Sequence, residues 1–393
     1  MGARRLLAIA LIAMGAPALA GCQVPGQVLR TGLSRTTTSA KSTTPPKKAT
    51  AAPTNRAGRA APKGPVAPAA GTSSAAGLKP VVRGLVDRQG KLSDQWAGVI
   101  RGIVVNLDWA SVQPTTAGSI DGTAIDTAVA TVRRFNLAHP STPVAIKLRV
   151  VAGSGAPAWL KQAVGTTYVQ NPVGAGSGDV PYWWTPRVET AYRDLMAGLA
   201  ARYDAVPEIR EVQISQCSLI YPEPLIRMRA DEEAFAAFKA HGLNRTDDLA
   251  CLRLAIDAHV AWKHTRSALA LNPYQDPDGK GSDVATSLAI AAYCRSVLGA
   301  RCVLENHSIR ETSQGADYEQ LYAGMQRLGR PLALQTAAPA KVGSLDVTLR
   351  KAVAFGAEAV ELPYDYRSWS PGTFSTTFAD VVTALARPLD PDR

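Results

Sequence analysis

The sequence predicts an α/β fold in which eight parallel strands alternate with helices. Three observations support this prediction: eight apolar runs, helical spacing of apolar residues between them, and the length of residues 80–393. Together they match a (β/α)8, or TIM, barrel, which takes roughly 250 residues or more. A doubly wound sheet is the alternative. However, no glycine-rich GxGxxG turn follows the first run, and no phosphate-binding P-loop motif occurs.

The predicted strands are mostly apolar along their whole length. Such runs are typical of parallel strands that are covered on both faces, whereas a half-exposed strand alternates apolar and polar residues. The runs are residues 81–86, 100–107, 144–151, 209–215, 268–272, 302–305, 331–335 and 359–362.

The segments between these runs have apolar residues every three or four positions, which indicates helices with one buried face. The clearest windows are residues 125–135, 188–199, 249–260, 318–328, 345–353 and 378–385. Thr185 and Pro186 suit the N-cap and first turn of the second window. The window after the first run, around residues 92–96, is short and is the weakest.

Residues 1–21 have the features of an export signal. Arg4 and Arg5 precede an apolar stretch, residues 6–14, that is too short to span a bilayer. The following Leu19-Ala20-Gly21-Cys22 resembles the lipobox of bacterial lipoproteins. The resemblance implies cleavage before Cys22, lipidation of Cys22, and anchoring of the exported chain to the outer face of the cell membrane. The alternative is an ordinary secretory signal that is cut after Ala20.

Residues 22–79 are predicted to form a disordered tether ahead of the barrel domain at 80–393. The segment is rich in Thr, Ser, Ala, Pro, Gly and Lys, so it has too little apolar surface to fold. Residues 1–79 hold 11 of the 43 Lys and Arg and no acidic residue, so residues 80–393 have 32 of each sign. This balance argues against nucleic-acid binding. The tether itself is either a solvated spacer or a segment attracted to anionic lipid headgroups or wall polymers.

Four cysteines follow Cys22, and an even number in an exported chain favours disulfides. Cys294 and Cys302 flank a predicted helix end and the next strand, so we expect them to pair. Cys217 and Cys251 would then form the second bond. Because no CxxC or HxxxH spacing occurs, we expect no metal site, and no motif predicts a cofactor.

In a (β/α)8 barrel the functional residues lie at the carboxyl ends of the strands. Here these positions hold carboxylates, amides and aromatic residues, which suits sugars, because aromatic rings pack on a pyranose and polar groups bind its hydroxyls. The candidate substrate-binding residues are Asp108, Trp109, Arg149, Tyr182, Trp183, Gln216, Asn272, His307, Gln335 and Tyr364. For Tyr182 and Trp183 the alternative is packing of a loop over the barrel, and for His307 it is a structural role.

Residues 100–160 resemble the second and third strand regions of retaining glycoside hydrolases with (β/α)8 barrels. The similar stretches are Trp109-Ala110-Ser111-Val112-Gln113-Pro114, Asp121-Gly122 before a helix, and Ala156-Pro157-Ala158-Trp159. The resemblance implies glutamates at the ends of strands four and seven, one acting as acid and base and the other as nucleophile. Instead, Gln216 and Cys217 follow strand four and Gln335 ends strand seven. An amide neither protonates a leaving group nor attacks an anomeric carbon.

Other carboxylates are therefore the catalytic candidates. Glu305 and Glu361 each lie at a strand end, and Glu223 lies between two prolines in the loop after strand four. The alternative for Glu305 is an ion pair with Lys147 or Arg149 across the barrel, and Glu361 has a similar alternative.

We therefore expect a lipoprotein that binds a carbohydrate or glycoconjugate and hydrolyses it if two of these carboxylates act. An inactive barrel that binds glycan or scaffolds a partner is the alternative. A solute-binding lipoprotein is the third class, but it would show two lobes rather than eight strand–helix units. Nothing in the sequence specifies an oligomeric state.

Overall fold

The computed structural model describes residues 77–171, 176–279 and 281–387. The predicted signal at 1–21, Cys22 and all but the last three residues of the predicted tether lie outside this described part. Among the helices within it, none combines the length and the apolar character needed to cross a bilayer.

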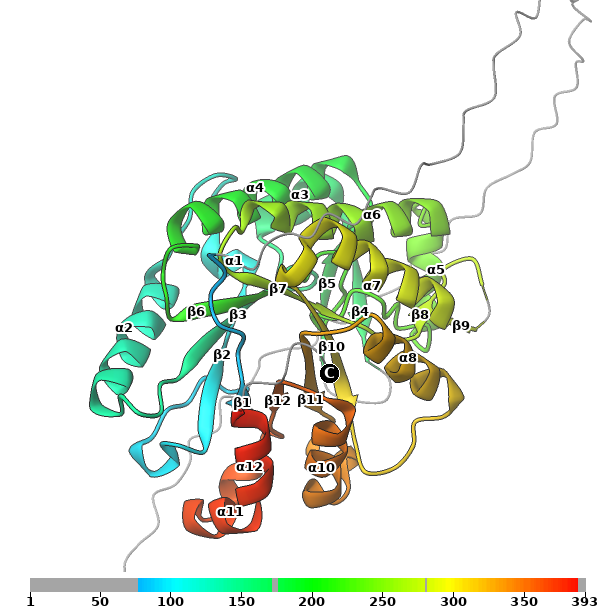
Figure 1. The fold of residues 1–393 in the computed structure, drawn as a ribbon. Coiled ribbons are helices and arrows are strands. Elements are labelled where there is room, and N and C mark those ends of the chain that lie inside the picture. Colours follow the sequence, from blue (N-terminus) through cyan, green and yellow to red (C-terminus); the bar gives the residue numbers. More distant parts are fainter. Residues whose placement is uncertain (1–76, 172–175, 280, 388–393) are drawn as a thin grey trace, which may run out of the picture. The chain divides into compact units, whose positions relative to one another are not determined.

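Eight parallel strands close into a barrel, which confirms the predicted fold (Figure 1). Each predicted run coincides with one barrel strand. In chain order the strands are β1 (Gly84–Asp87), β2 (Ile100–Asp108), β3 (Ala145–Val151), β6 (Ile209–Gln213), β7 (Arg266–Ala270), β10 (Cys302–Ile309), β11 (Leu332–Thr336) and β12 (Ala359–Glu361). β12 pairs with both β11 and β1, so the last strand closes the ring.

The helices surround the barrel, as Figure 1 shows. The longer ones are α2 (Thr123–Ala138), α4 (Pro186–Tyr203), α5 (Glu232–Ala240), α6 (Arg245–Ala258), α7 (Val284–Leu298), α8 (Ala316–Arg327), α10 (Leu345–Phe355) and α12 (Ala379–Ala386). α4 begins at Pro186 with Thr185 as its N-cap, as predicted. α7 was not among the predicted windows, because apolar residues lie all round it and blur the helical period.

The shorter elements lie in the connections. The helices are α1 (Trp109–Val112), α3 (Ala158–Val164), α9 (Pro339–Val342) and α11 (Pro371–Thr377), with 3-10 turns η1 (Asp94–Trp96), η2 (His259–Ala261), η3 (Gly299–Arg301) and η4 (Tyr366–Ser368). Two hairpins join β4 (Thr166–Gln170) to β5 (Ser177–Pro181) and β8 (Tyr274–Gln275) to β9 (Ser282–Asp283). The weak window around residues 92–96 is only the turn η1, in which the ring of Trp96 packs edge-on against Tyr366.

The lumen of the barrel is apolar in its amino-terminal half. Small side chains fill it: Val82, Val86, Val104, Ala145, Ala268, Val303, Ala333 and Ala359. Because side chains two positions apart on a strand point the same way, the next inward residues are set by this layer. On β3, β10 and β12 they are Lys147, Glu305 and Glu361. The register therefore places a charged layer directly above an apolar one.

Both predicted disulfides are present in the structure. Cys217 bonds to Cys251, 34 residues away, and Cys294 bonds to Cys302, 8 residues away. The first joins the segment after β6 to α6, and the second joins α7 to the start of β10.

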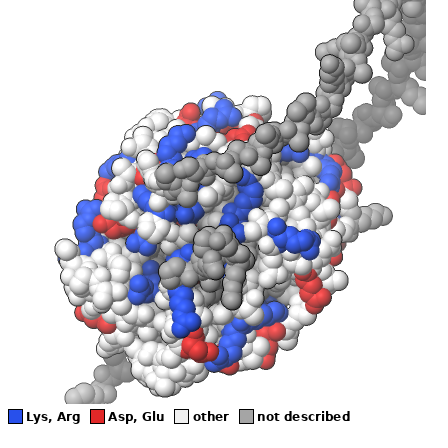
Figure 2. Space-filling model, in the orientation of Figure 1, with Lys and Arg blue, Asp and Glu red and all other residues white. Residues whose placement is uncertain are grey.

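Lys and Arg side chains gather on the face drawn in Figure 2, which looks onto the amino ends of the strands. Arg101, Arg210 and Arg266 lie at the starts of β2, β6 and β7. Burial lowers the pKa of all three. Arg266 and Arg301 donate to backbone carbonyls here. Basic side chains therefore predominate on the part of this face that is drawn, although residues 80–393 as a whole have balanced charges.

Candidate active site

A lysine surrounded by three glutamates lies inside the barrel, above the apolar layer. The Nζ of Lys147 is 2.8 Å from Glu361 Oε1 and 3.2 Å from Glu211 Oε1, and it donates to Glu305 Oε1. All four side chains are at most 4% exposed. The ion pair with Lys147, the predicted alternative for Glu305, is therefore present, and Glu361 shares the same ammonium group.

A second set of contacts lies beside this cluster. Arg149 donates from Nη2 to Glu361 Oε1 at 2.6 Å and from Nη1 to Asn106 Oδ1 at 3.4 Å. His307 Nε2 is 3.1 Å from Glu305 Oε2. The structure thus brings four predicted site residues, Arg149, Glu305, His307 and Glu361, into one connected network.

The charges of this network are nearly balanced. Burial by itself would raise the pKa of Glu305 and Glu361, but the positive charges around them lower it. For Glu305 the main cause is Lys147, followed by His307, and for Glu361 it is Arg149, followed by Lys147. The same attractions raise the pKa of Lys147 and Arg149 against the effect of burial.

Glu211 differs from its two neighbours. Burial raises its pKa to about 8, and the charge of Glu305 acts in the same direction against the opposing Lys147. The layer thus favours the charged forms of Lys147, Arg149, Glu305 and Glu361 and shifts Glu211 towards its protonated form.

One ligand atom each of Glu305, His307 and Glu361 lies within 4.8 Å of the others. Such a trio resembles a metal site, but the Lys147 ammonium already bridges the two carboxylates. A metal ion would have to displace it, so the donor set does not fit a resident metal. The same spacing brings the carboxylates as close as the pair of a retaining glycosidase, in which about 5 Å is typical.

Glu223 lies outside this layer, in the loop that follows β6. It is half-buried, and Asn272 Nδ2 donates to its Oε1 at 2.9 Å. Asn272 Oδ1 in turn accepts from Tyr318 OH at 3.1 Å and from Asn306 Nδ2 at 3.4 Å. Glu223 and Asn272, both predicted site residues, thus form a second group whose contacts are uncharged amides and a phenol.

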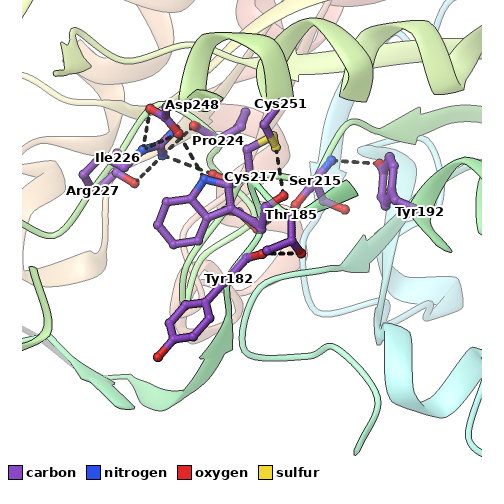
Figure 3. The surroundings of a disulfide bond; sticks show 12 residues. Tyr182, Thr185, Tyr192, Ser215, Cys217, Pro224, Ile226, Arg227, Asp248 and Cys251 are labelled. Carbon is purple, nitrogen blue, oxygen red and sulfur yellow. Dashed lines mark hydrogen bonds and ion pairs between the residues drawn. A yellow bond between two sulfur atoms is a disulfide. The ribbon is translucent and has the colours of Figure 1, made fainter. Parts of the chain in front are cut away.

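The loop that carries Glu223 is fixed at both ends (Figure 3). At its start, Cys217 adopts a left-handed φ of 61° and bonds to Cys251 on α6. Near its end, Arg227 pairs with Asp248 of α6 at 2.7 Å, and both side chains are fully buried. Arg227 Nη1 also donates to the carbonyls of Cys217, Pro224 and Ile226. These bonds leave the backbone near Glu223 little freedom.

Three of the predicted aromatic residues are packed into the protein. Trp109 is fully buried and donates to Gln113 Oε1, and Trp183 is 2% exposed and donates to Asp248 Oδ1. The ring of Tyr182 is stacked on His241 with centroids 4.5 Å apart. Packing of the loop, the alternative for Tyr182 and Trp183, describes these contacts, and neither tryptophan has a ring face open to a sugar.

The remaining predicted residues lie around the carboxyl ends of the strands. Asp108 ends β2 and is exposed. Gln216 is buried after β6, and its amide has no hydrogen-bond partner among the described residues. Gln335 in β11 donates weakly to the His307 carbonyl at 3.4 Å, and Tyr364 is 55% exposed after β12. Gln216 thus lies in the segment after β6, and Gln335 lies within β11.

Several residues of the site were missed in the sequence. Glu211 and Gln213 alternate along β6, and Arg88 comes two positions after the inward-facing Val86. The signal that could have found them is the alternation of inward-facing and outward-facing side chains along a strand, applied within the predicted apolar runs. Tyr318 and Tyr322 had no comparable signal, since their contacts with Asn272 and Asn306 depend on how α8 lies against the barrel.

No protein-family profile matches this chain, and no curated protein matches its sequence. Among solved structures, the catalytic domain of a β-amylase from Paenibacillus polymyxa is similar, with a TM-score of 0.52 and 11% identity. The match covers 78% of this chain and 99% of that domain. The chain therefore shares the barrel fold of that domain.

Two further glycosidases are more distant. A β-galactosidase from Rahnella sp. R3 matches with a TM-score of 0.47 and 13% identity, over 78% of this chain and 57% of that one. Endo-glycoceramidase II from Rhodococcus sp. matches with a TM-score of 0.43 and 13% identity, over 72% and 73%. At these identities the likeness concerns the fold, so the site must be judged from its own residues.

Proposed function

We propose that this protein is an exported lipoprotein whose barrel binds a carbohydrate, or the sugar part of a glycoconjugate, and hydrolyses it with two carboxylates. Lipidated Cys22 and the tether would hold the barrel at the outer face of the cell membrane. The observation that carries the catalytic part is the state of Glu361. It is buried and negatively charged, its Oε1 is held by Arg149 and Lys147, and its Oε2 has no partner among the described residues.

Glu361 suits the role of nucleophile. Its ionised oxygen would attack the anomeric carbon, forming a glycosyl ester while the glycosidic C–O bond breaks. The lowered pKa keeps the group charged at neutral pH, and the two cations fix its position. Because Glu305 shares Lys147 and is also charged, it cannot supply the proton at that pH, and its role here is to hold Lys147.

Glu223 suits the role of acid and base. It extends from the loop after β6, which lies across the barrel ring from β12, and its partner Asn272 is uncharged. Its proton would go to the leaving oxygen. It would then take a proton from the water that cleaves the glycosyl ester, which restores both carboxyl groups.

The test is a panel of oligosaccharides assayed for release of reducing sugar, with Glu361→Gln and Glu223→Gln variants. We expect each substitution to lower turnover about 100- to 10,000-fold, the range for loss of such a group, while binding persists. Glu232→Gln, at an exposed position on α5, is the matched control and should be unchanged. If turnover survives in both variants, Glu361 is not the nucleophile and Glu223 is not the acid and base.

A glycan-binding protein without catalysis is the second candidate function. Two points favour it: the Lys147 ammonium bridges Glu305 and Glu361, and amides, Gln216 and Gln335, stand where the sequence resemblance implies glutamates. The same panel separates the candidates, because binding without turnover by the unmodified protein supports this one.

The membrane anchor needs its own test. Cys22→Ala should move the protein from the membrane fraction to the soluble fraction and abolish incorporation of labelled fatty acid. If the variant stays in the membrane fraction, the lipoprotein proposal fails, whatever the barrel binds.

A further inference from the structure

A third cation, Arg88, lies next to the site and has no acidic partner. It follows β1 and is 4% exposed. Within the described part of the chain, no carboxylate lies within ion-pair distance of its guanidinium; Glu361 and Asp365 act on it only from farther away. Since Asp87 next to it is held by Arg367 and Tyr366, that carboxylate is already engaged. A guanidinium cannot lose its charge in a protein, so its burial demands compensation.

The hydrogen bonds of Arg88 leave one buried edge of its guanidinium without a partner among the described residues. Nη1 donates to the Thr336 carbonyl at 3.0 Å, whereas Nε and Nη2 have no partner among the described residues. The Tyr364 ring covers one face of the group, with its centroid 3.9 Å from Cζ. Nε–H and Nη2–H are parallel donors on one side of the guanidinium, and this is the edge that binds a carboxylate through two hydrogen bonds.

Other unpaired polar atoms belong to residues around this edge. Arg149 Nε and Thr336 Oγ1 are buried and also lack partners in the described part of the structure. Asn106 links the two arginines, since it donates to the Arg88 carbonyl at 2.9 Å and accepts from Arg149. Lys147 and Arg149 are paired with carboxylates of the layer, whereas no carboxylate among the described residues pairs with Arg88. Arg88 is therefore the cation of this group that lacks a carboxylate partner.

We propose that the ligand is an acidic glycan, in which the carboxylate of a uronic-acid-type sugar binds side-on to Arg88. This inference rests on the proposed function, because it places the acidic group beside the carboxylates at the same end of the barrel. One ligand carboxylate would pair with the Arg88 charge and accept from both unpaired N–H groups. A hydroxyl group of a neutral sugar can accept from these groups but supplies no negative charge.

The test compares matched glycans that differ only in this group. The full mature chain with Cys22→Ala is titrated with uronic-acid oligosaccharides and with the same oligosaccharides after reduction of each carboxyl to a hydroxymethyl group. We expect the acidic form to bind about 10- to 100-fold more tightly, as for a charge-assisted pair of hydrogen bonds. Sulfated oligosaccharides form a third arm, and preference for them over the uronic form would contradict the assignment of a carboxylate.

Variants at Arg88 decide whether this residue is responsible. Arg88→Gln should abolish the preference for the acidic form over the reduced form, whereas Arg88→Lys should keep part of it, because lysine carries the charge without the fork. Arg187→Gln, at an exposed position on α4, is the matched control. Thermal unfolding checks that each variant folds.

The outcomes separate this inference from the function on which it rests. If both forms of the glycan bind equally, or if Arg88→Gln keeps the full preference, the acidic-ligand inference is overturned while carbohydrate binding stands. If neither form binds in any member of the panel, the proposed function fails and this inference fails with it.

Discussion

The barrel holds two groups of carboxyl side chains that differ in how they are neutralised. Glu211, Glu305 and Glu361 surround Lys147 deep in the lumen, where every member is at most 4% exposed. Glu223 lies half-buried on a loop, where its hydrogen-bond partner is the amide of Asn272. The deep group is thus held by charge, and the loop group is held by neutral hydrogen bonds on an anchored backbone.

The difference teaches which group can change its protonation during a reaction. A buried ion pair is not always stabilising, but removing one partner leaves a buried charge at a cost of several kcal/mol. Any proton movement in the deep layer carries that cost. Glu223 has no ion-pair partner among the described residues, and its contact is the neutral amide of Asn272.

Loss of Lys147 should have the largest effect on the deep group. In Lys147→Met, Glu305 and Glu361 lose the ammonium between them, so we expect the free energy of unfolding at pH 7 to fall by about 3–5 kcal/mol. The deficit should shrink at pH 4, where the carboxyls can take up protons. Urea unfolding at both pH values measures it. The exposed Lys341→Met serves as control, and a loss below about 1 kcal/mol would mean that the layer is not held by charge.

Removing a disulfide tests the anchoring of the loop group. Chain entropy predicts a loss of about 4 kcal/mol for Cys217→Ser with Cys251→Ser and about 2.5 kcal/mol for Cys294→Ser with Cys302→Ser, because the first closes the longer loop. Only the first pair should also reduce turnover, since it starts the loop of Glu223. If loss of either disulfide lowers turnover equally, the anchoring of the Glu223 loop does not determine turnover.

The pH dependence of stability tests the protonated state of Glu211. Its pKa is raised to about 8 in the folded protein, so the folded state binds more protons than the unfolded state between about pH 4.5 and 8. This contribution is full below about pH 4.5 and is lost as the pH rises towards 8, at up to about 1.4 kcal/mol per pH unit.

Glu211→Gln keeps the neutral shape and should remove this slope in urea unfolding at pH 5, 6.5 and 8. Glu305 and Glu361 act in the opposite direction. Because their pKa values are lowered in the folded protein, the stability that they contribute is present at neutral pH and is lost only as the pH falls into the acid range. A slope that is unchanged in Glu211→Gln would assign the titration to another group.

The smallest effect is expected in the hydrogen bonds around Glu223. Tyr318→Phe removes the donor to Asn272 Oδ1, which still accepts from Asn306, so the free energy of unfolding should fall by about 1 kcal/mol. The apparent pKa of the pH–rate profile should also shift if Asn272 positions Glu223. If stability falls while that profile stays fixed, the network is only structural.

The sequence predicted the eight strands and both disulfides because these depend on local patterns. Continuous apolar runs mark strands covered on two faces, and the spacing of four cysteines in a strand–helix repeat leaves few pairings. It also placed Glu361 at a strand end and Glu223 in the loop after the fourth strand. Glu305, predicted at a strand end, lies inside β10, because that strand continues to Ile309 beyond its apolar start. The hairpins β4–β5 and β8–β9 were missed, because they lie inside connections that were assigned no strands.

Only the tertiary structure decided what each polar side chain contacts. Lys147 meets Glu305 across 158 residues of sequence, and Arg149 meets Glu361 across 212. Three further features also depend on neighbours from other parts of the chain. They are the burial of Trp109 and Trp183, the raised pKa of Glu211 and the unpaired Nε–H and Nη2–H groups of Arg88. Hydrophobic periodicity is a property of one segment and can be found in the sequence. Electrostatic balance is a property of groups brought within a few ångströms by closure of the barrel, and no single segment contains it.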